Sequence, residues 1–447
     1  MAQMICTDLL SMRTQPPPAP EKQAMQDKGE MRIHNRLLGV IGLSLAALAC
    51  GASLAQATPF VVIDADSGAV VAEQESTRRW YPASLTKLVT VYVALTALRQ
   101  GQVGLDTPIQ ISMRAARMPP SKMGFNPGSE VTLENALKML MVKSANDIAV
   151  TIAEGLGGSM EGFANQMNAA AARLGMHESH FVNPNGLHND DHYSSARDMA
   201  IVGRALFRDF PEYAGLFGIG ALRLGEQVIP THNGLLGRYP GADGMKTGFT
   251  CPAGFNVVAS ATRGERRLIA VVLGYPNAKA RTLKVASLLD AGFMGGTGGP
   301  SIASLRAIPG APPNNRPRVC GAHREQVAED DFAVPVAQRP AEGDHTAAFF
   351  ATNGAGAPAS SVAAIQEQLH TRPSFEPVDV YVGRAPGWTG PALAARGDAP
   401  RVETSIAAPP LAKAKGKHRG KKADKKKAAP KAETKPTPPA RPKTAQH

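Results

Sequence analysis

The sequence predicts an α+β domain in which one antiparallel sheet is flanked by helices, within residues 58–293. Strand-rich runs lie near both ends of this region, at residues 60–64 and 69–72 and again at residues 255–261 and 268–273. Helical patterns fill the sequence between them and predict a helical subdomain. Because strands pair in one sheet whose faces are covered by helices, the two ends of the region are expected to meet in a single antiparallel sheet.

Each pair of strand-rich runs is expected to form a β-hairpin. Asp66-Ser67-Gly68 separates the first pair and Arg263-Gly264-Glu265 separates the second, and both strings are typical of tight turns. The flanking runs are rich in β-branched and other apolar residues, which suit a half-buried pleated surface. Lys246-Thr247-Gly248 is expected to open a further strand just before the second hairpin.

Helical periodicity marks the segments between and after the hairpins. They are residues 84–98, 130–142, 148–156, 162–174, 199–207 and 278–291. Thr132 is a typical N-cap, because a threonine hydroxyl accepts a hydrogen bond from an N–H group of the first turn. After Gly292 the sequence becomes rich in Gly and Pro. The predicted domain therefore ends near residue 293.

The rest of the chain is expected to be largely irregular. Residues 294–410 lack sustained periodicity apart from a strand-like run at 378–382, and residues 411–447 are a Lys/Ala/Pro tail. Such a tail cannot bury enough apolar surface to offset its ordering entropy, which predicts disorder.

The chain of 447 residues has a formal net charge of +12, and almost all of it belongs to the tail. Residues 411–447 contain 13 Lys and Arg against 2 Asp and Glu, which leaves a charge of only +1 for the other residues. The net charge therefore gives no indication of a basic, nucleic-acid-binding face on the folded part, and nucleic acid is not an expected partner. The tail is either a solvated segment or an electrostatic contact to anionic membrane lipid or cell-wall polymers, at about 1 kcal/mol per basic residue near an anionic membrane.

Residues 31–57 are expected to be a secretory signal peptide. A basic stretch at 31–36 precedes an apolar run at 37–49, and Ala55-Gln56-Ala57 is an A-x-A cleavage site. The apolar run is short for a membrane span of roughly 20 residues. Residues 1–30 are then a leader, or Met31 is the true start of the protein.

Two cysteines remain after the predicted leader and signal peptide are removed. Cys251 and Cys320 form an even pair in a chain that is expected to be exported. An oxidising compartment permits a disulfide between them. Two independent thiols are the alternative.

Ser84-Leu85-Thr86-Lys87 lies at the start of the first predicted helix. Spacing of three residues puts the Ser84 and Lys87 side chains on one helical face, close enough for a hydrogen bond. A serine hydroxyl is a weak nucleophile that needs an adjacent base. Lysine serves as that base only when its pKa falls through burial or through a neighbouring cation.

Two further strings supply polar groups. Ser144-Ala145-Asn146 follows an apolar helix and offers a hydroxyl that relays a proton and an amide that holds a carbonyl. Lys246 and Thr247 offer a cation and a hydroxyl to a carboxylate, and Gly248 lets a ligand approach the backbone. Each string alone is common. Their joint order is a known set of catalytic motifs in serine acyl-transfer enzymes.

The chain resembles the low-molecular-mass penicillin-binding proteins, the serine-type D-alanyl-D-alanine carboxypeptidases. The resemblance runs from about residue 58 to 293 and includes the strings at 82–87, 181–187, 192–200 and 246–250. It implies a β-lactamase/transpeptidase-like fold, with neither metal nor cofactor. It also implies a periplasmic enzyme that is peripheral to the inner membrane or free of it.

The resemblance implies a role for each catalytic residue. Ser84 would be the acylated nucleophile, Lys87 its general base, and Ser144 a proton relay. Asn146 would bind the peptide or hold Lys87. The substrate would be a peptidoglycan stem pentapeptide that loses its terminal D-Ala, and β-lactams would acylate Ser84 as mimics of this substrate.

The same resemblance implies how the substrate is held. Lys246 and Thr247 would receive the terminal carboxylate, with Lys246 also lowering the pKa of Lys87. Backbone N–H groups of Ser84 and Phe249 would form an oxyanion hole. Cys251 is interpreted as structural, paired with Cys320 to hold the start of the tail on the domain.

Alternatives remain open at this level. A β-lactamase would need a fast deacylation base, and no Glu-x-x-Leu-Asn string occurs between Asn146 and Lys246. A DD-endopeptidase would use the same residues, whereas a non-catalytic cell-wall scaffold would not need them. Many members of the family carry a C-terminal β-domain and an amphipathic membrane helix, and neither is evident after Gly292.

Overall fold

The computed structural model describes residues 58–296, 298–322 and 373–396. The predicted leader, the signal peptide and the basic tail lie outside the described residues, as does much of the segment from 294 to 410. Within the described residues, no helix combines the length and the apolarity that a membrane span requires.

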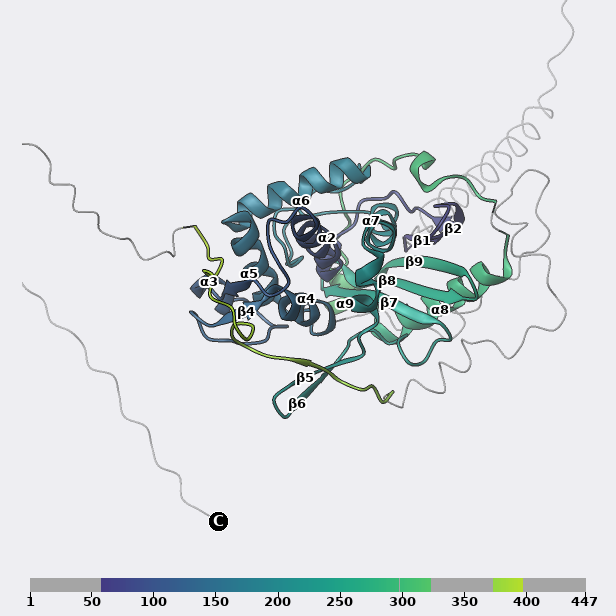
Figure 1. Ribbon diagram of the computed structural model, residues 1–447. Helices are drawn as coiled ribbons and strands as arrows, with labels where there is room; N and C mark the ends of the chain where they lie inside the picture. The colour runs from purple at the N-terminus through teal and green to yellow at the C-terminus, as the bar shows by residue number, and fades with distance from the viewer. Residues whose placement is uncertain (1–57, 297, 323–372, 397–447) are drawn as a thin grey trace, which may run out of the picture. The chain divides into compact units, whose positions relative to one another are not determined.

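The main sheet has five antiparallel strands in the order β2-β1-β9-β8-β7 (Figure 1). The strands are β1 (Phe60–Asp64), β2 (Val70–Gln74), β7 (Ala242–Thr250), β8 (Gly254–Arg263) and β9 (Arg266–Tyr275). Strand β1 pairs with β9, from Phe60 opposite Val272 to Asp64 opposite Leu268. The predicted single sheet that joins the two terminal hairpins is confirmed.

Helices fill the chain between β2 and β7 and follow β9. They are α2 (Thr86–Arg99), α3 (Met113–Ala116), α4 (Leu133–Val142), α5 (Asn146–Gly157), α6 (Met160–Leu174), α7 (Ala196–Asp209) and α8 (Ala278–Met294), with 3₁₀ turns η1 (Ala83–Leu85) and η2 (Pro211–Gly218). The N-cap hydroxyl of Thr132 accepts from the N–H group of Asn135, as the sequence predicts. The predicted stretch 130–142 is divided, because Glu130–Thr132 forms strand β4 before the helix begins.

Both faces of the main sheet are buried, and alternate residues of each strand enter different cores. Ile269 and Val271 of β9 belong to a cluster that includes residues of α2 and α7. Ala270 and Val272 belong to a second cluster that includes residues of α8. This alternation follows from the two-residue period of a strand. It explains why β9 is a continuous apolar run, since each side chain meets one of the two helical layers.

Strand β7 begins at Ala242, four residues earlier than the sequence indicates. Its first residues include Asp243 and Gly244, which are residue types depleted in strands. The Asp243 carboxylate accepts hydrogen bonds from Ser260 Oγ and Thr262 Oγ1 of β8, both at 2.6 Å. These side-chain bonds hold a stretch where the register shifts between Ala242 and Gly244. Lys246 therefore lies within the strand instead of opening it.

Two small sheets complete the described fold. One pairs β3 (Pro108–Gln110) with β4, and the other has the order β10-β5-β6. In the latter, β5 (Ala221–Leu224) and β6 (Gln227–Pro230) form a hairpin, and β10 (Val378–Val380) lies parallel to β5. The strand-like run at 378–382 is thus part of a sheet whose partner strands the sequence did not indicate.

A disulfide joins Cys251, just after β7, to Cys320 at the end of α9 (Arg316–Cys320), with Cα atoms 5.7 Å apart. The Asn315 N–H group and its side-chain amide both donate to the carbonyl of Pro252, at 2.9 and 3.1 Å. These bonds hold the segment after α8 against the turn between β7 and β8. That turn adjoins the end of the strand that carries Thr247 and Phe249.

Candidate active site

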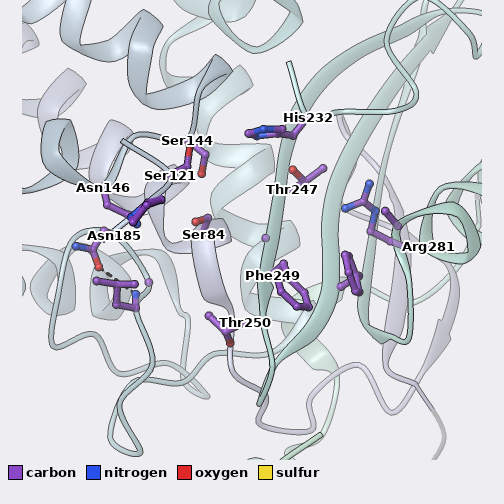
Figure 2. A pocket seen from close by; sticks show the side chains of 16 residues that line it. Ser84, Ser121, Ser144, Asn146, Asn185, His232, Thr247, Phe249, Thr250 and Arg281 are labelled. Carbon is purple, nitrogen blue, oxygen red and sulfur yellow. Dashed lines mark hydrogen bonds between the residues drawn. The ribbon is translucent and has the colours of Figure 1, made fainter. Parts of the chain in front are cut away.

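A cleft of about 570 Å³ lies between strand β7 and the helical part of the fold. It is lined by Ser84, Pro120, Ser121, Ser144, Asn146, Asn185, Gly186, Leu187, His232, Thr247, Gly248, Phe249, Thr250, Phe255, Ala278 and Arg281. Figure 2 shows Ser144, Asn146 and Asn185 on one side, Thr247 and Phe249 on β7 opposite them, and Ser84 between the two sides. Residues far apart in the sequence therefore share one cavity.

Ser84 lies in η1, where the chain turns from β2 into α2. Strand β7 passes so close to this turn that a Cβ atom on Gly248 would lie 2.9 Å from the Pro82 carbonyl oxygen and 3.0 Å from the Ser84 nitrogen. Ala83 has a φ of 49°, a left-handed conformation that is strained for a residue with a side chain. Gly248 thus accommodates the protein's own turn at Ser84, whereas the sequence suggested an approaching ligand.

Lys87 is fully buried directly behind Ser84. Its Nζ lies 2.8 Å from Ser84 Oγ and donates hydrogen bonds to Asn146 Oδ1 at 2.8 Å and to the Asn185 carbonyl at 2.7 Å. Burial, and then the positive charge of Lys246, lowers the pKa of Lys87 well below its ordinary value, while Asp147 acts in the opposite direction. This is the environment that lysine needs to act as a base.

Ser144 lies in the short loop between α4 and α5, and Asn146 is the first residue of α5. Ser144 has a φ of 59°, which a non-glycine residue adopts only where the surrounding structure holds it. The Asn146 side-chain amide donates to the Pro119 carbonyl at 3.0 Å. Because only the NH₂ group can donate, this bond leaves Oδ1 of Asn146 facing Lys87.

Asp147 fixes the loop that forms one wall of the cleft. This buried carboxylate accepts hydrogen bonds from the N–H groups of Met123 at 3.0 Å and Gly124 at 2.8 Å. The N–H group of Asn146 donates to the Ser121 carbonyl at 2.7 Å. The start of α5 and the loop around Ser121 are therefore held as one unit beside Ser84.

Lys246 and Arg281 place buried positive charge beside the cleft. Burial, and then the charge of Arg281, lowers the pKa of Lys246 to about 7, and burial lowers the pKa of Arg281 to about 10. Arg281 therefore stays protonated at neutral pH. Its Nε is buried without a hydrogen-bond partner, and in the described part of the chain its other nitrogens donate only to neutral oxygens, the Asn256 carbonyl and the Thr282 hydroxyl. An anion bound in the cleft would offset the cost of burying this positive charge.

His232 also faces the cleft but adds little charge at neutral pH. Burial, and then the positive charges of Lys246, Lys143 and Arg281, lowers the pKa of His232 to about 4. Its imidazole is consequently neutral under ordinary conditions. It offers a hydrogen-bonding group rather than a cation.

The structure brings together the residues that the sequence singled out. Those that line the cleft are Ser84, Ser144, Asn146, Thr247, Gly248 and Phe249. Lys87 and Lys246 are buried next to it, and Lys246 Nζ donates to the Thr247 carbonyl at 2.9 Å. The described residues contain no group of three or more side chains arranged to hold a metal ion.

Sequence reasoning assigned no role to Asn185, His232 or Arg281. Asn185 contributes a backbone carbonyl, which leaves no trace in residue type. Arg281 carried one weak signal, because it lies in the first turn of α8, where no acidic residue occurs. A cation is unfavourable at a helix N-terminus, so its presence there calls for another explanation.

The fold and the residues of the cleft match those expected of the penicillin-binding class of proteins. The profile of the D-alanyl-D-alanine carboxypeptidase family, peptidase family S11, matches residues 48–277, slightly more than half of the chain. The chain belongs to this family.

Individual relatives agree with this assignment. The chain is 36% identical over 242 residues to D-alanyl-D-alanine carboxypeptidase DacF of Bacillus subtilis, covering 53% of this chain and 62% of DacF. It is 36% identical over 258 residues to DacA of Escherichia coli, covering 56% and 64%. It thus spans less than two thirds of the length of either relative.

Among solved structures, penicillin-binding protein 5 of Haemophilus influenzae is similar with a TM-score of 0.52 and 37% identity, over 53% of this chain and 70% of that one. D-alanyl-D-alanine carboxypeptidase DacD of Francisella tularensis has a TM-score of 0.52 and 30% identity over the same shares. The predicted fold class is confirmed.

The close passage of β7 past the turn at Ser84 predicts that adding one methyl group at Gly248 destabilises the fold. Gly248→Ala should lower the free energy of unfolding by about 1–3 kcal/mol, because the new Cβ meets backbone atoms that cannot rotate away. Thermal unfolding measures the loss. Gly215→Ala is the matched control, since a Cβ there meets nothing within 4 Å. Equal stability of the two variants would contradict the described packing.

Proposed function

We propose that this protein is a serine D-Ala-D-Ala carboxypeptidase that removes the terminal D-Ala from peptidoglycan stem pentapeptides through an acyl-enzyme on Ser84. The hydrogen-bond geometry of Lys87 carries this proposal. A neutral amine has two N–H groups and one lone pair. The carbonyl oxygens of Asn146 and Asn185 can only accept, so they take both N–H groups. The lone pair is left to accept the hydroxyl proton of Ser84, whose Oγ lies 2.8 Å from Nζ.

The acylation step follows from this geometry. Ser84 Oγ attacks the carbonyl carbon of the penultimate D-Ala while its proton passes to Lys87 Nζ. The tetrahedral intermediate then collapses, the C–N bond breaks, and a proton reaches the leaving amine through the Ser144 hydroxyl. Free D-Ala departs. Water attacks the Ser84 ester in the second half of the reaction, which frees the shortened peptide and restores the hydroxyl.

The N–H groups of Ser84 and Phe249 would stabilise the oxyanion of the intermediate. Both residues line the cleft, from η1 and from β7 respectively. The close contact at Gly248 fixes the separation of these two segments. Donors that are fixed before the reaction stabilise developing charge without further reorganisation, which is the main advantage of such a site.

The terminal carboxylate of the substrate would bind at the cationic end of the cleft. Thr247 offers its hydroxyl there, and Arg281 offers a buried guanidinium whose partners among the described residues are neutral oxygens. Lys246 precedes Thr247 on β7 and is buried next to the cleft, where it adds positive charge. This arrangement favours a peptide with a free C-terminal carboxylate over an internal peptide bond.

Several finer properties belong to the same proposal. Export to the periplasm would follow from the predicted signal peptide, and the similarity to relatives named D-alanyl-D-alanine carboxypeptidase supports it. β-Lactams would acylate Ser84, as the similarity to a penicillin-binding protein suggests. The basic tail would contact anionic membrane lipid or cell-wall polymers. The family match does not favour a β-lactamase or a non-catalytic scaffold.

The proposed nucleophile can be tested directly. Incubation with a fluorescent penicillin should label the chain, and peptide mapping should place the label on Ser84. Ser84→Ala should abolish labelling while leaving thermal unfolding close to that of the unchanged protein. Slow loss of the label and release of D-Ala from a stem pentapeptide are expected of a carboxypeptidase. Rapid turnover of the penicillin would instead identify a β-lactamase, and a label at another residue would exclude the Ser84 acyl-enzyme.

Two substrates that differ only at the C-terminus distinguish carboxylate binding by Arg281 from a general loss of activity. Arg281→Gln should lower kcat/KM about 10- to 100-fold for a peptide with a free terminal carboxylate, because a hydrogen bond to a charged group is lost. The same peptide with a C-terminal amide serves as the control and should lose little. Equal losses for the two peptides would show that Arg281 does not bind the carboxylate.

A further inference from the structure

The loop at residues 181–187 supplies the Asn185 carbonyl that orients Lys87, and specific contacts hold this loop in place. It lies along α2, where the Thr90 hydroxyl donates to the Pro184 carbonyl at 2.7 Å. One residue further on, the Asn185 carbonyl accepts from Lys87 Nζ at 2.7 Å. The position of this loop therefore sets the position of the lysine amine.

The loop is also packed tightly against the nucleophile turn. A Cβ atom on Gly186 would collide with the carbonyl oxygen of Ala83, and Gly186 has a φ of +80°. Only glycine suits both conditions. A small displacement of the loop would consequently open a gap beside Ser84 and admit solvent to the buried amine.

His192 joins this loop to the start of α2. The N–H group of Val182 donates to His192 Nδ1 at 3.1 Å, so Nδ1 is unprotonated. Nε2 must then carry the proton, and it donates to Thr86 Oγ1 at 2.8 Å. The imidazole is buried, and its ring meets the Phe181 ring edge-on with centroids 5.5 Å apart. Both ring nitrogens are thus used, one on each segment.

This bridge requires a neutral imidazole, and its surroundings keep it neutral. Burial, and then the charges of His180, His188 and Lys87, lowers the pKa of His192 to about 3. A protonated ring would lose the acceptor for Val182 and add a positive charge beside Lys87. The bridge therefore persists across the whole neutral range.

We propose that His192 is a positioning residue for the acyl-transfer reaction, which bridges Thr86 and Val182 and so holds the Asn185 carbonyl against the Lys87 amine. The inference rests on the proposed function, because it assigns the bridge a purpose in activating Ser84. His192 is not among the residues that line the cleft. It acts through the loop, and Thr86, one residue before Lys87, is its contact on α2.

Thr86→Val tests the bridge, because it keeps the shape of the side chain and removes the acceptor. The rate of Ser84 labelling by a fluorescent penicillin should fall at least about tenfold at neutral pH. The acid limb of its pH profile should move to higher pH. Solvent that enters beside Lys87 raises its pKa toward the ordinary value, while Lys246 on β7 and Asp147 on α5 remain in place.

Further variants separate an effect on the position of Lys87 from a general loss of stability. Thr86→Ser keeps the hydroxyl and should retain the unchanged profile. Thr77→Val removes another buried hydroxyl, which donates to the Arg306 carbonyl at 2.7 Å, and should lower the melting temperature without moving the acid limb. His192→Gln should shift the limb as Thr86→Val does. The double variant Thr86→Val/His192→Gln should lose no more of the labelling rate than the more impaired of its two single variants, because both changes break the same bridge.

The outcomes distinguish this inference from the proposed function. If the unchanged protein is not labelled at Ser84, the proposed function fails. If it is labelled, but Thr86→Val and His192→Gln keep its acid limb and rate per folded molecule, the positioning role is contradicted. If Thr86→Val does not fold, His192→Gln decides the question. Additive rate losses in the double variant would also contradict a shared bridge.

Discussion

The burial of one lysine amine is the constraint on which the rest of this site depends. Removing an ammonium group from water is costly, so Lys87 gives up its proton more readily than a lysine in water does. The neutral amine must still satisfy two N–H groups, and the carbonyls of Asn146 and Asn185 do so. Both carbonyls must hold their positions, because a shift of either one would turn the lone pair away from Ser84.

Much of the surrounding structure can be understood as support for those two carbonyls. On one side, Asp147 ties the start of α5 to the loop that carries Pro119, whose carbonyl orients the Asn146 amide. On the other side, His192 ties the loop of Asn185 to α2. The two supports come from different parts of the chain. They meet at Lys87, whose amine donates to one carbonyl from each side.

Sequence reasoning found the parts of this site that depend on residue type at short spacing. Ser84 and Lys87 are three residues apart, where η1 runs into α2, and Thr247 is part of the Lys246-Thr247-Gly248 string. It could not find the Asn185 carbonyl, because every residue has one, nor the partnership of Arg281 with the cleft, because that depends on how α8 packs. The sheet was predictable from apolar strand runs. The early start of β7 was not, since side-chain hydrogen bonds to Asp243 replace the usual strand signal.

Direct observation of the Lys87 proton tests the central claim. Lysine-selective ¹⁵N NMR, with Lys87→Arg to assign the signal, follows protonation of this amine as pH is changed. The account predicts that the Lys87 amine loses its proton at a pH well below that of exposed lysines, which stay protonated to about pH 10. A Lys87 signal that titrates together with the exposed lysines would contradict the proposed base, whatever the activity of the enzyme.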